Sequence, residues 1–565
     1  MTRLTKQWLI DPPPTETARA ALSDHPPLIA QILFNRGLVT TEAARLFFAG
    51  QLAQSDDPAL LTGLPASVDR LQSAIRAGEK IAVYGDYDTD GVTATALLVQ
   101  VLRVLGADVQ PYIPDREGEG YGLNHEALKK LKNEGVAVVL TVDCGIRSLE
   151  EAETARAIGL DLIISDHHHP SDELPRALAV VNPKQPGDVY PDKDLAGVGI
   201  AYKIAQGLIR PLNPRPAING SDVLDLVALG TVADLASLTG ENRVLVRQGL
   251  NVLNKPRREG LKSLMTIARL KPGGIDSTAI GFMLGPRLNA AGRLESALAA
   301  YELLTTTDIM RAGQLAMQLE QQNRDRQELT RQAQARAREI ALATHPDAAL
   351  LFAADADFRP GVVGLAAARL TDEFYRPSVV ATITGDVTKG SARSIREFHI
   401  TEAFDQCKDL LTKHGGHAAA AGFTAPTANL EALAQRLRQI AEQQLGHLDL
   451  RPTVRVNAEV PLQDVTGELM KGLQQFEPCG YGNPSPLLAT RGLSVAHARP
   501  VGGEGKHLKL TLTDGRVTVD AIAFNQGYWH NNLPARVDVA YHLEMNEWNG
   551  EKRIQLNVRD LRAAE

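Results

Sequence analysis

VYGDYDTDGVTAT, residues 83–95, joins an apolar run to three closely spaced aspartates. The run IAVYG (81–85) is typical of a buried strand, and Gly91 opens a segment with a helical pattern. The carboxylates between them belong to Asp86, Asp88 and Asp90. Three carboxylates this close repel one another strongly unless a multivalent cation neutralises them. The stretch therefore predicts a metal site at the carboxyl end of a strand.

An EF-hand calcium loop also begins with alternating aspartates followed by glycine. That loop requires a preceding helix and a glutamate at its twelfth position. Counting from Asp86, the twelfth residue is Leu97, and the run before the loop is strand-like. We therefore exclude an EF-hand.

The surrounding segment, from about Lys80 to Leu238, alternates short apolar runs with helical patterns. Near-continuous apolar runs are typical of strands buried on both faces of a parallel sheet. A doubly wound α/β domain is predicted by five such runs: IAVYG (81–85), ADVQPYI (107–113), VAVVLTV (136–142), DLIIS (161–165) and AVVN (179–182).

Further acidic and imidazole side chains occupy similar positions. Asp143 follows one apolar run, Asp166, His167 and His168 follow another, and Asp234 lies in an apolar helical segment. Ligands bind at the carboxyl ends of strands in open parallel sheets, so we expect these groups to converge. For any single aspartate, capping of the next helix is an equally good interpretation. The whole set exceeds what one ion needs. It predicts two bridged ions, with ligands that suit Mn²⁺ or Mg²⁺.

The rest of the chain divides by pattern. Residues 308–345 form one helical stretch with a polar middle (320–332), which indicates a helix that crosses solvent between domains; a surface helix packed at its two ends is the alternative. After about residue 452, short alternating runs predict strand pairs joined at Asp514-Gly515 and Asn549-Gly550. We expect a helical N-terminal region (1–62), a parallel-sheet α/β domain (63–305), a long connecting helix (306–345), a second, smaller α/β domain (346–450) and a β-rich OB-type barrel (451–565).

Composition narrows the function classes. The 565 residues carry a net charge of −7, which argues against binding nucleic acid by bulk charge alone. Three cysteines without a CxxC pair argue against a disulfide framework or a zinc knuckle. No segment is apolar enough for a signal peptide or a membrane span. We expect a cytoplasmic protein that does not bind membranes.

GDYDTDG, VDCG, SDHHH and GTVAD stand in the order and context of the four motifs of the DHH phosphoesterase superfamily. The segment with GSARS and GGHAAAAG resembles the domain that accompanies the DHH catalytic domain and binds its substrate. Together with GPRLNAAGR (285–293), FEPCGYGNPSP (476–486) and the β-rich tail, the chain resembles the bacterial single-strand-specific 5′→3′ exonucleases of this superfamily over roughly 500 residues.

The resemblance implies roles for individual residues. The implied metal ligands are Asp86, Asp88, Asp90, Asp143, His167 and Asp234, with Asp143 as the bridge between two ions. His168 would sit beside the scissile phosphate as a charge stabiliser or proton donor. The division of the first three aspartates between the two ions stays open.

Substrate contacts must come from other segments. Ser391 and Arg393 alternate on an extended segment, so their side chains face the same way and suit a phosphate clamp. His417 follows two glycines that permit close backbone approach. An edge-strand pair and a glycine-rich turn without function are the alternatives. In the resembled family both motifs bind substrate across a cleft from the metal site. Weaker candidates for phosphate contacts are Arg116, Arg287, Asn289 and Arg293.

The function implied is hydrolysis of single-stranded DNA to 5′-mononucleotides by a two-metal mechanism, in DNA repair and recombination. A monomer working with a helicase and a single-strand-binding protein is the expected context. Two other functions stay open: a small-nucleotide or cyclic-dinucleotide phosphodiesterase, which would hardly need the β-rich domain, and a non-catalytic single-strand-binding scaffold, which would have no reason to keep every ligand position.

Overall fold

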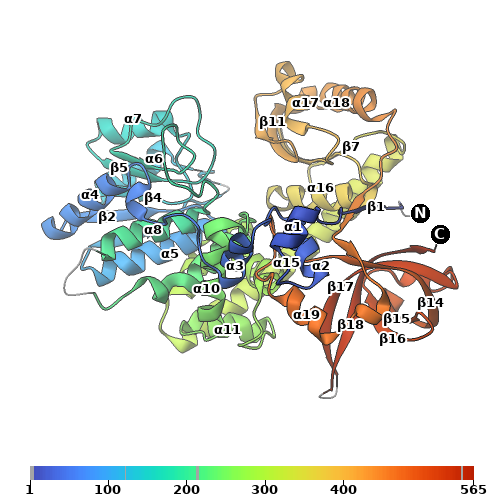
Figure 1. Ribbon diagram of the computed structural model, residues 1–565. Coiled ribbons are helices and arrows are strands. Elements are labelled where there is room, and N and C mark those ends of the chain that lie inside the picture. The colour runs from blue at the N-terminus through green and yellow to red at the C-terminus, as the bar shows by residue number, and fades with distance from the viewer. Residues whose placement is uncertain are drawn as a thin grey trace. The chain divides into compact units, whose positions relative to one another are not determined.

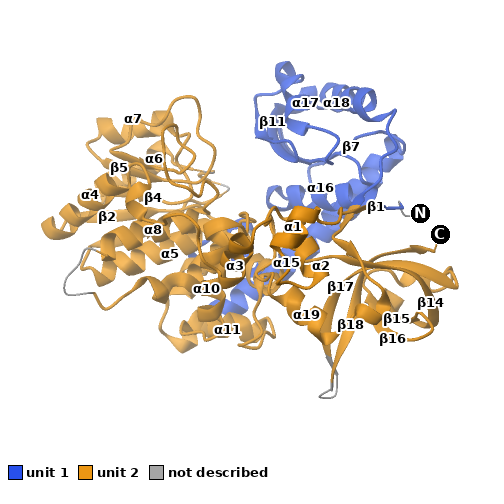
Figure 2. Ribbon diagram, viewed as in Figure 1, with its two compact units in different colours: residues 1–7, 287–299, 314–453 blue, residues 8–286, 300–313, 454–565 orange. Residues whose placement is uncertain are grey.

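The computed structural model describes residues 5–116, 118–120, 122–210, 216–294, 296–548 and 551–564. Its contacts divide the chain into two compact units (Figure 2). Unit 1 contains residues 1–7, 287–299 and 314–453; unit 2 contains residues 8–286, 300–313 and 454–565.

A five-stranded parallel sheet forms the centre of the first half of unit 2 (Figure 1). Its strand order is β3-β2-β4-β5-β6. The strands are β2 (Lys80–Tyr84), β3 (Val109–Tyr112), β4 (Val136–Thr141), β5 (Asp161–Ser165) and β6 (Ala179–Val181). All neighbouring strands are parallel, so the predicted sheet is confirmed strand by strand.

Helices cover both faces of this sheet. One face packs against α6 (His125–Asn133) and α7 (Leu149–Ala157). The other packs against α4 (Leu64–Ala77), α5 (Thr89–Val104) and α8 (Gly197–Ile209). A helical layer continues from there as α9 (Leu224–Ala233), α10 (Gly240–Leu253), α11 (Glu259–Ile267), α12 (Ser277–Ala279), the π-helical turn η3 (Ile280–Leu284), α13 (Gly285–Leu294) and α14 (Leu298–Thr305); the 3-10 turns η1 (Pro58–Leu60) and η2 (Gly220–Val223) precede α4 and α9.

The connector helix is α15 (Ile309–Thr344). The sequence pattern predicted that the polar middle of this helix is exposed to solvent on all sides. The structure differs, because Gln322, Asn323 and Thr330 are buried. Some polar side chains there bond within the helix: Arg326 donates to Oδ1 of Asn323 at 2.8 Å, and the Thr330 hydroxyl donates to the Arg326 carbonyl at 2.7 Å. Hydrogen bonds of this kind let a polar face pack without apolar residues.

Unit 1 contains a mixed sheet of order β10-β11-β9-β8-β7, in which only β7 and β8 run parallel. The second half of α15 and α16 (Pro360–Phe374) pack on one face, while α17 (Ile400–Asp405) and α18 (Leu430–Leu445) pack on the other. The strands are β7 (Leu351–Asp355), β8 (Ser378–Thr384), β9 (Val387–Arg393), β10 (Lys413–His417) and β11 (Ala420–Pro426), and the 3-10 turns are η4 (Lys408–Leu410) and η5 (Thr427–Asn429).

The C-terminal part of unit 2 is a closed five-stranded barrel of OB type, as predicted. Strands β14 (Leu488–Val501), β15 (His507–Thr513), β16 (Thr518–Ala523), β18 (Glu551–Ala563) and β17 (Arg536–Trp548) follow in order, and β17 pairs back with β14. The Asp514-Gly515 turn joins β15 to β16 as predicted. Asn549 and Gly550 lie outside the described residues, but the strands on either side of them pair antiparallel. Shorter elements are β12 (Thr453–Val456), β13 (Ala458–Glu459), η6 (Leu462–Asp464), α19 (Gly467–Gln474), η7 (Gly503–Gly505) and η8 (Gly527–Trp529).

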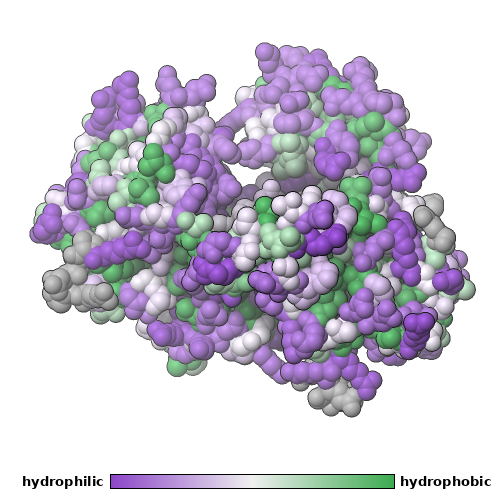
Figure 3. All heavy atoms as spheres, viewed as in Figure 1, coloured by the Kyte–Doolittle hydropathy of each residue, from purple (hydrophilic) through white to green (hydrophobic). Residues whose placement is uncertain are grey.

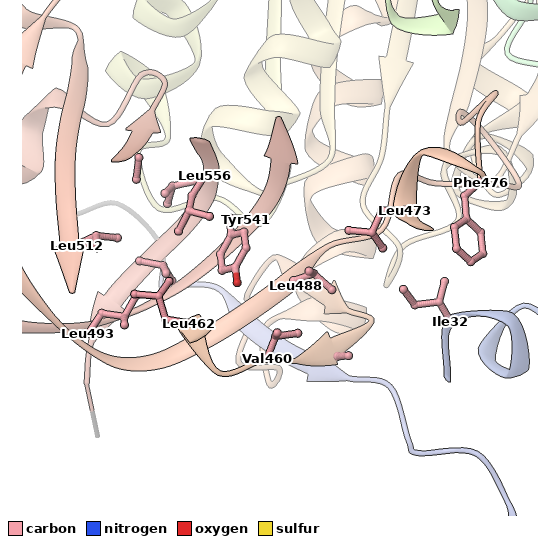
Figure 4. Close-up of a cluster of buried hydrophobic side chains, with 14 of the residues drawn as sticks. Ile32, Val460, Leu462, Leu473, Phe476, Leu488, Leu493, Leu512, Tyr541 and Leu556 are labelled. Carbon is pink, nitrogen blue, oxygen red and sulfur yellow. The ribbon is translucent and has the colours of Figure 1, made fainter. Parts of the chain in front are cut away.

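The N-terminal helices contribute to the barrel core. They are α1 (Glu16–Ala21), α2 (Pro27–Asn35) and α3 (Thr41–Ala49), and strand β1 (Gln7–Ile10) pairs with β12. Ile32 and Leu33 of α2 are completely buried in the same cluster as Leu488 and Tyr541 of the barrel. Figure 4 shows Ile32 beside Phe476, the residue that ends the turn after α19. The first and last parts of the sequence therefore share one hydrophobic core.

Hydrophilic residues cover most of the face drawn in Figure 3. Within the described ranges, no helix combines the length and the apolarity that crossing a bilayer requires. The cysteines Cys144, Cys407 and Cys479 are all buried and unbridged.

Candidate metal centre

The loop between β2 and α5 carries the first three aspartates. Asp86 is buried two residues after the strand ends, and Asp88 caps α5 by accepting a hydrogen bond from Gly91 N at 3.1 Å. A Cβ atom at residue 91 would lie 2.5 Å from Asp86 N, so the turn closes only around glycine. The capping interpretation therefore holds for Asp88, while the other two carboxylates are directed elsewhere.

Asp90 joins this loop to α8. Its Oδ2 accepts a hydrogen bond from Gly197 N at 2.7 Å, and its Oδ1 accepts one from Val198 N at 2.9 Å. The carboxylate thus lies at the N-terminus of α8, where the helix dipole favours negative charge. Burial and the charge of Asp88 raise the pKa of Asp90 to about 7. Each oxygen keeps a second lone pair that can bind a cation.

Asp143, His167 and Asp234 meet beside this loop. Asp143 follows β4 with a left-handed φ of 61° and is 1% exposed. Nε2 of His167 lies 3.1 Å from Oδ1 of Asp143 and 3.7 Å from Oδ2 of Asp234. Three overlapping groups have ligand atoms within 4.8 Å of one another: Asp86, Asp88 and Asp143; Asp90, His167 and Asp234; and Asp143, His167 and His168. The structure thus brings together all six side chains that the sequence assigned to metal.

The electrostatics of the cluster suit divalent cations. Burial, reinforced by neighbouring carboxylates, raises the pKa of Asp86 and of Asp143, and raises the pKa of Asp234 to about 9. Burial and the neighbouring His168 lower the pKa of His167 to about 3, so its imidazole is neutral. Oδ1 of Asp86 and Nε2 of His167 are buried, and no described residue supplies either with a hydrogen bond. Cations bound by oxygen and neutral imidazole would relieve both the repulsion and the unsatisfied atoms.

Asp166 proves to be a positioning residue for His168. Its Oδ1 accepts hydrogen bonds from the His168 backbone at 3.1 Å and from His168 Nδ1 at 2.7 Å, and its Oδ2 accepts one from Ile146 N at 2.9 Å. Burial opposes protonation of His168, but the hydrogen bond that its ring donates to Asp166 and the nearby negative charges raise its pKa overall. The arrangement fixes Nδ1 of the ring, and with it the orientation of the imidazole.

Two polar residues after β6 hold the histidine turn in place. Nδ2 of Asn182 donates to the His168 carbonyl at 2.9 Å, and Nζ of Lys184 donates to the His167 carbonyl at 2.8 Å. Neither residue is predicted as part of the site from the sequence. The indication in the sequence is their position at or just after the end of AVVN (179–182), a predicted strand that ends at the same edge of the sheet. His169, by contrast, is exposed.

The weaker phosphate candidates are divided between the two units. Arg116 belongs to unit 2, lies over the Tyr87 ring at 4.7 Å and is close enough to Asp86 to lower its pKa against the larger effect of burial. The other three lie on α13 in unit 1. Arg287 pairs with Glu320 at 2.7 Å, Arg293 donates to the Gly361 carbonyl at 3.4 Å, and Asn289 is half-buried. Within unit 2, Arg116 therefore lies near Asp86 of the acidic cluster.

Ser391, Arg393 and His417 share one face of the unit 1 sheet. Ala420 of β11 stands between Arg393 of β9 and His417 of β10. Two positions further along β11, Gly422 stands between Ser391 of β9 and Gly415 of β10. Residues directly opposite one another on neighbouring strands point to the same face. His417 is exposed, and a Cβ at Gly415 would have open space around it.

The same face carries two glycines, Gly415 and Gly422. Between Ser391 and His417 the sheet presents mainly backbone, and α16 approaches the arginine through Gly364, whose Cβ would lie 3.1 Å from Nη2 of Arg393. Burial lowers the pKa of Arg393. The segment around His417 is a strand of the β10–β11 hairpin rather than a turn leading into a helix, because Ala420–Pro426 extends the sheet.

Comparison with known proteins covers nearly the whole chain. Residues 80–231 match the DHH family N-terminal domain, residues 347–443 match the DHHA1 domain, and residues 456–560 match the RecJ OB domain. The chain is 39% identical to the single-stranded-DNA-specific exonuclease RecJ of Bacillus subtilis over 95% of this chain and 68% of that protein. It is 33% identical to the Escherichia coli protein of the same name over 95% of this chain and 96% of that one.

A solved structure shows the same architecture. The crystal structure of RecJ from Thermus thermophilus in complex with Mn²⁺ superposes with a TM-score of 0.85 at 32% identity, covering 99% of this chain and 80% of that one. The findings agree: three domains match, relatives are more than 30% identical along almost the entire chain, and the fold is shared. This chain belongs to the RecJ family.

Proposed function

We propose that this chain is a metal-dependent exonuclease specific for single-stranded DNA, which hydrolyses phosphodiester bonds in the 5′→3′ direction and releases 5′-mononucleotides in DNA repair and recombination. The observation that carries the proposal is the buried cluster of carboxylates and imidazole at the carboxyl ends of the parallel strands. Relatives named single-stranded-DNA-specific exonuclease supply the substrate class.

In this proposal two divalent cations, Mn²⁺ or Mg²⁺, are held by Asp86, Asp88, Asp90, Asp143, His167 and Asp234, with Asp143 shared between them. When bound, such ions activate water and neutralise charge on the phosphate. Support for the assignment comes from the raised pKa values of the buried aspartates, of which the most isolated from solvent is Asp90. An acidic cluster of this kind is costly to bury unless cations occupy it.

The protein's own contribution to chemistry centres on His168. Asp166 fixes its Nδ1 and, against the opposing effect of burial, raises the His168 pKa, which favours the protonated ring. A cationic imidazole here would stabilise negative charge on the phosphate or donate a proton to the leaving oxygen. Asn182 and Lys184 hold the backbone of the histidine turn.

Substrate binding is proposed for the face that carries Ser391, Arg393 and His417, and Arg116 is proposed as a phosphate contact beside Asp86. Exposed backbone between the side chains of that face suits the close approach of a phosphate chain. Arg287, Asn289 and Arg293 are proposed to support binding from α13. In the barrel, Phe524 and Tyr528 are about half exposed and suit base stacking, whereas Tyr541 is buried in the core.

The same proposal includes the expected setting of the enzyme. We propose domain limits of 1–62, 63–305, 306–345, 346–450 and 451–565, and a monomer that works in the cytoplasm. A nuclease restricted to single strands needs another activity to unwind duplex DNA and must act on strands coated by binding protein. A helicase and a single-strand-binding protein are therefore the proposed partners.

The deciding experiment compares substrates with the purified chain and Mn²⁺. We expect rapid release of mononucleotides from 5′-phosphorylated single-stranded DNA, little action on blunt duplex DNA, and loss of activity on adding EDTA. Asp143→Ala should abolish cleavage, while Asp172→Asn, a change at an exposed carboxylate, should not. Equal degradation of blunt duplex, turnover of dinucleotides alone, or full activity of Asp143→Ala would contradict the proposal.

A further inference from the structure

Leu235 directly follows the proposed metal ligand Asp234 and has an unusual conformation. Its φ is 62°, in the left-handed region that side chains with a Cβ atom rarely adopt, and its side chain is 69% exposed. Backbone hydrogen bonds hold the turn: Leu235 N donates to Val232 O at 3.3 Å, and Ala236 N donates to Thr231 O at 3.2 Å. A strained, solvent-exposed leucine beside a reaction centre gains nothing from packing, which points to a functional contact.

Tyr481 is presented next to the same segment by a rigid turn. The motif FEPCGYGNPSP supplies the turn, in which Gly480 and Asn483 bond to each other and Asn483 Nδ2 donates to the Phe476 and Pro478 carbonyls at 3.0 and 2.8 Å. The Tyr481 carbonyl accepts a hydrogen bond from Leu238 N at 2.7 Å. Leu238 is three residues after Leu235, so this hydrogen bond joins the Tyr481 backbone to the segment that follows Asp234. Tyr481 itself is 69% exposed.

Phe282 is a third exposed apolar residue, and its neighbour Gly281 lies near the helix that ends just before Asp234. Phe282 lies in the π-helical turn η3, and at 79% it has the highest exposed fraction of any large apolar side chain in the described residues. A Cβ at neighbouring Gly281 would lie 3.9 Å from Val232, in the helix turn that precedes Asp234. We call Leu235, Phe282 and Tyr481 the apolar rim.

We infer that the apolar rim is a platform for the base of the nucleotide next to the scissile phosphodiester. The inference rests on the proposed nuclease function, which places that phosphodiester at the metal cluster. A base is attached within one nucleotide's length of its phosphate, and Leu235 is covalently adjacent to the cluster. Aromatic and apolar side chains contact the faces of all four bases, which suits an enzyme that degrades DNA of any sequence.

Oligonucleotides that lack single bases test the platform. We prepare 5′-phosphorylated 20-mers with one abasic site at the first, second or twelfth nucleotide and measure kcat/KM for the first cleavage. Wild-type protein should cleave the substrate that is abasic at the first or at the second nucleotide about tenfold more slowly than intact DNA. A tenfold loss lies within the range that loss of one base–side-chain stack produces. The substrate that is abasic at the twelfth nucleotide should be cleaved as fast as intact DNA.

Variants of the rim should lose that discrimination. Tyr481→Ala and Leu235→Gly should cleave intact DNA about as slowly as the wild type cleaves the abasic substrate that it disfavours. Tyr481→Phe should behave as wild type. Leu235→Gly also relieves the left-handed backbone, so its Tm should not fall. Val189→Ala is the matched control, since Val189 is also 69% exposed, and it should change nothing.

Two results would overturn the inference. Equal cleavage of all substrates by the wild type would show that no base is contacted near the reaction centre. Equal slowing of intact and abasic DNA in the variants would show a structural role only. If the wild type cleaves no DNA, the proposed function fails instead. The base contacts can then still be tested by binding: fluorescence anisotropy in Ca²⁺ compares the affinities of the wild type and of Tyr481→Ala for intact and abasic 20-mers.

Discussion

Among the single residues of the centre, two neighbouring aspartates differ in their partners. Asp143 lies among other carboxylates, which add to the effect of burial and raise its pKa. Asp166 is equally buried, yet hydrogen bonds and charges from the histidines outweigh burial and lower its pKa. One carboxylate is therefore suited to bind cations and the other to orient His168.

Asp166→Asn should slow catalysis without removing the metal. The amide keeps the size of the side chain but loses the charge that supports a protonated His168. We expect kcat to fall about a hundredfold, the low end of what acid–base groups contribute. His168→Ala should show a similar loss, and the double variant little more, because the two residues act together.

Steady-state kinetics and Mn²⁺ titration check this prediction. Asp172→Asn serves as the control, since its carboxylate is exposed on the next loop. Additive losses in the double variant, or a matching loss of Mn²⁺ affinity in Asp166→Asn, would contradict a positioning role.

Metal removal should destabilise the protein, and Asp86→Asn should weaken this dependence. The wild type buries several mutually repelling carboxylates, and Oδ1 of Asp86 has no hydrogen bond from a described residue. At a Mn²⁺ concentration 100 times Kd, binding adds about 2.7 kcal/mol to the free energy of unfolding. Asp86→Asn should unfold at the same or a higher temperature than the wild type in EDTA, and should gain less from Mn²⁺. Thermal unfolding with and without metal measures both; an equal gain in the two proteins would exclude Asp86 as a ligand.

Among the secondary-structure elements, α10 is linked to α3 and to the turn after α19 by the buried side chain of Arg243. Nη1 of Arg243 donates to the Phe47 carbonyl at 2.7 Å, and its Nη2 donates to the Glu477 carbonyl at 3.0 Å. The guanidinium also lies 3.7 Å from the centre of the Phe47 ring. Burial and the nearby Arg247 lower the Arg243 pKa to about 10, still high enough for a full charge at neutral pH. The turn that presents Tyr481 is thereby tied to the catalytic domain.

Arg243→Ala should destabilise this junction by about 3 kcal/mol, because buried carbonyls lose their donors. Arg243→Lys should rescue little of the loss, since one ammonium cannot serve carbonyls on both sides. Hydrogen exchange of residues 475–483 and thermal unfolding report the effect. Arg257→Ala, which removes an exposed arginine that pairs with Asp222, should change stability by less than about 0.5 kcal/mol. Comparable effects of the two changes would argue against the junction.

In the architecture of the full chain, α15 contributes to the core of the unit 1 sheet. Ala333, Ala337 and Ala341 are buried against Ala353 and Val380 of the strands. A fragment that begins after the helix would leave this apolar face uncovered. Exposed apolar faces of this kind favour aggregation or loose packing.

Fragment 314–453 should therefore fold cooperatively, whereas 346–453 should not. Circular dichroism during heating and binding of a dye for exposed apolar surface distinguish the two outcomes. Ala337→Asp in the longer fragment should reproduce the defect, and Glu339→Ala, at an exposed position of the same helix, should not. A cooperative transition in 346–453 without dye binding would show that the helix is dispensable for this core.

Residue order alone was enough to predict the parallel sheet and the convergence of acidic and imidazole side chains at one edge of it, whereas the individual metal ligands were implied by the family resemblance. Apolar runs report burial on both faces, and the carboxyl ends of parallel strands meet at one edge, so Asp86, Asp143 and His167 could be assigned together. Three other features became visible only in the folded chain: Asp166 serves His168, Lys184 supports the histidine turn, and α2 fills the barrel core. These depend on which atoms approach across long sequence separations, and neither periodicity nor local spacing carries that information.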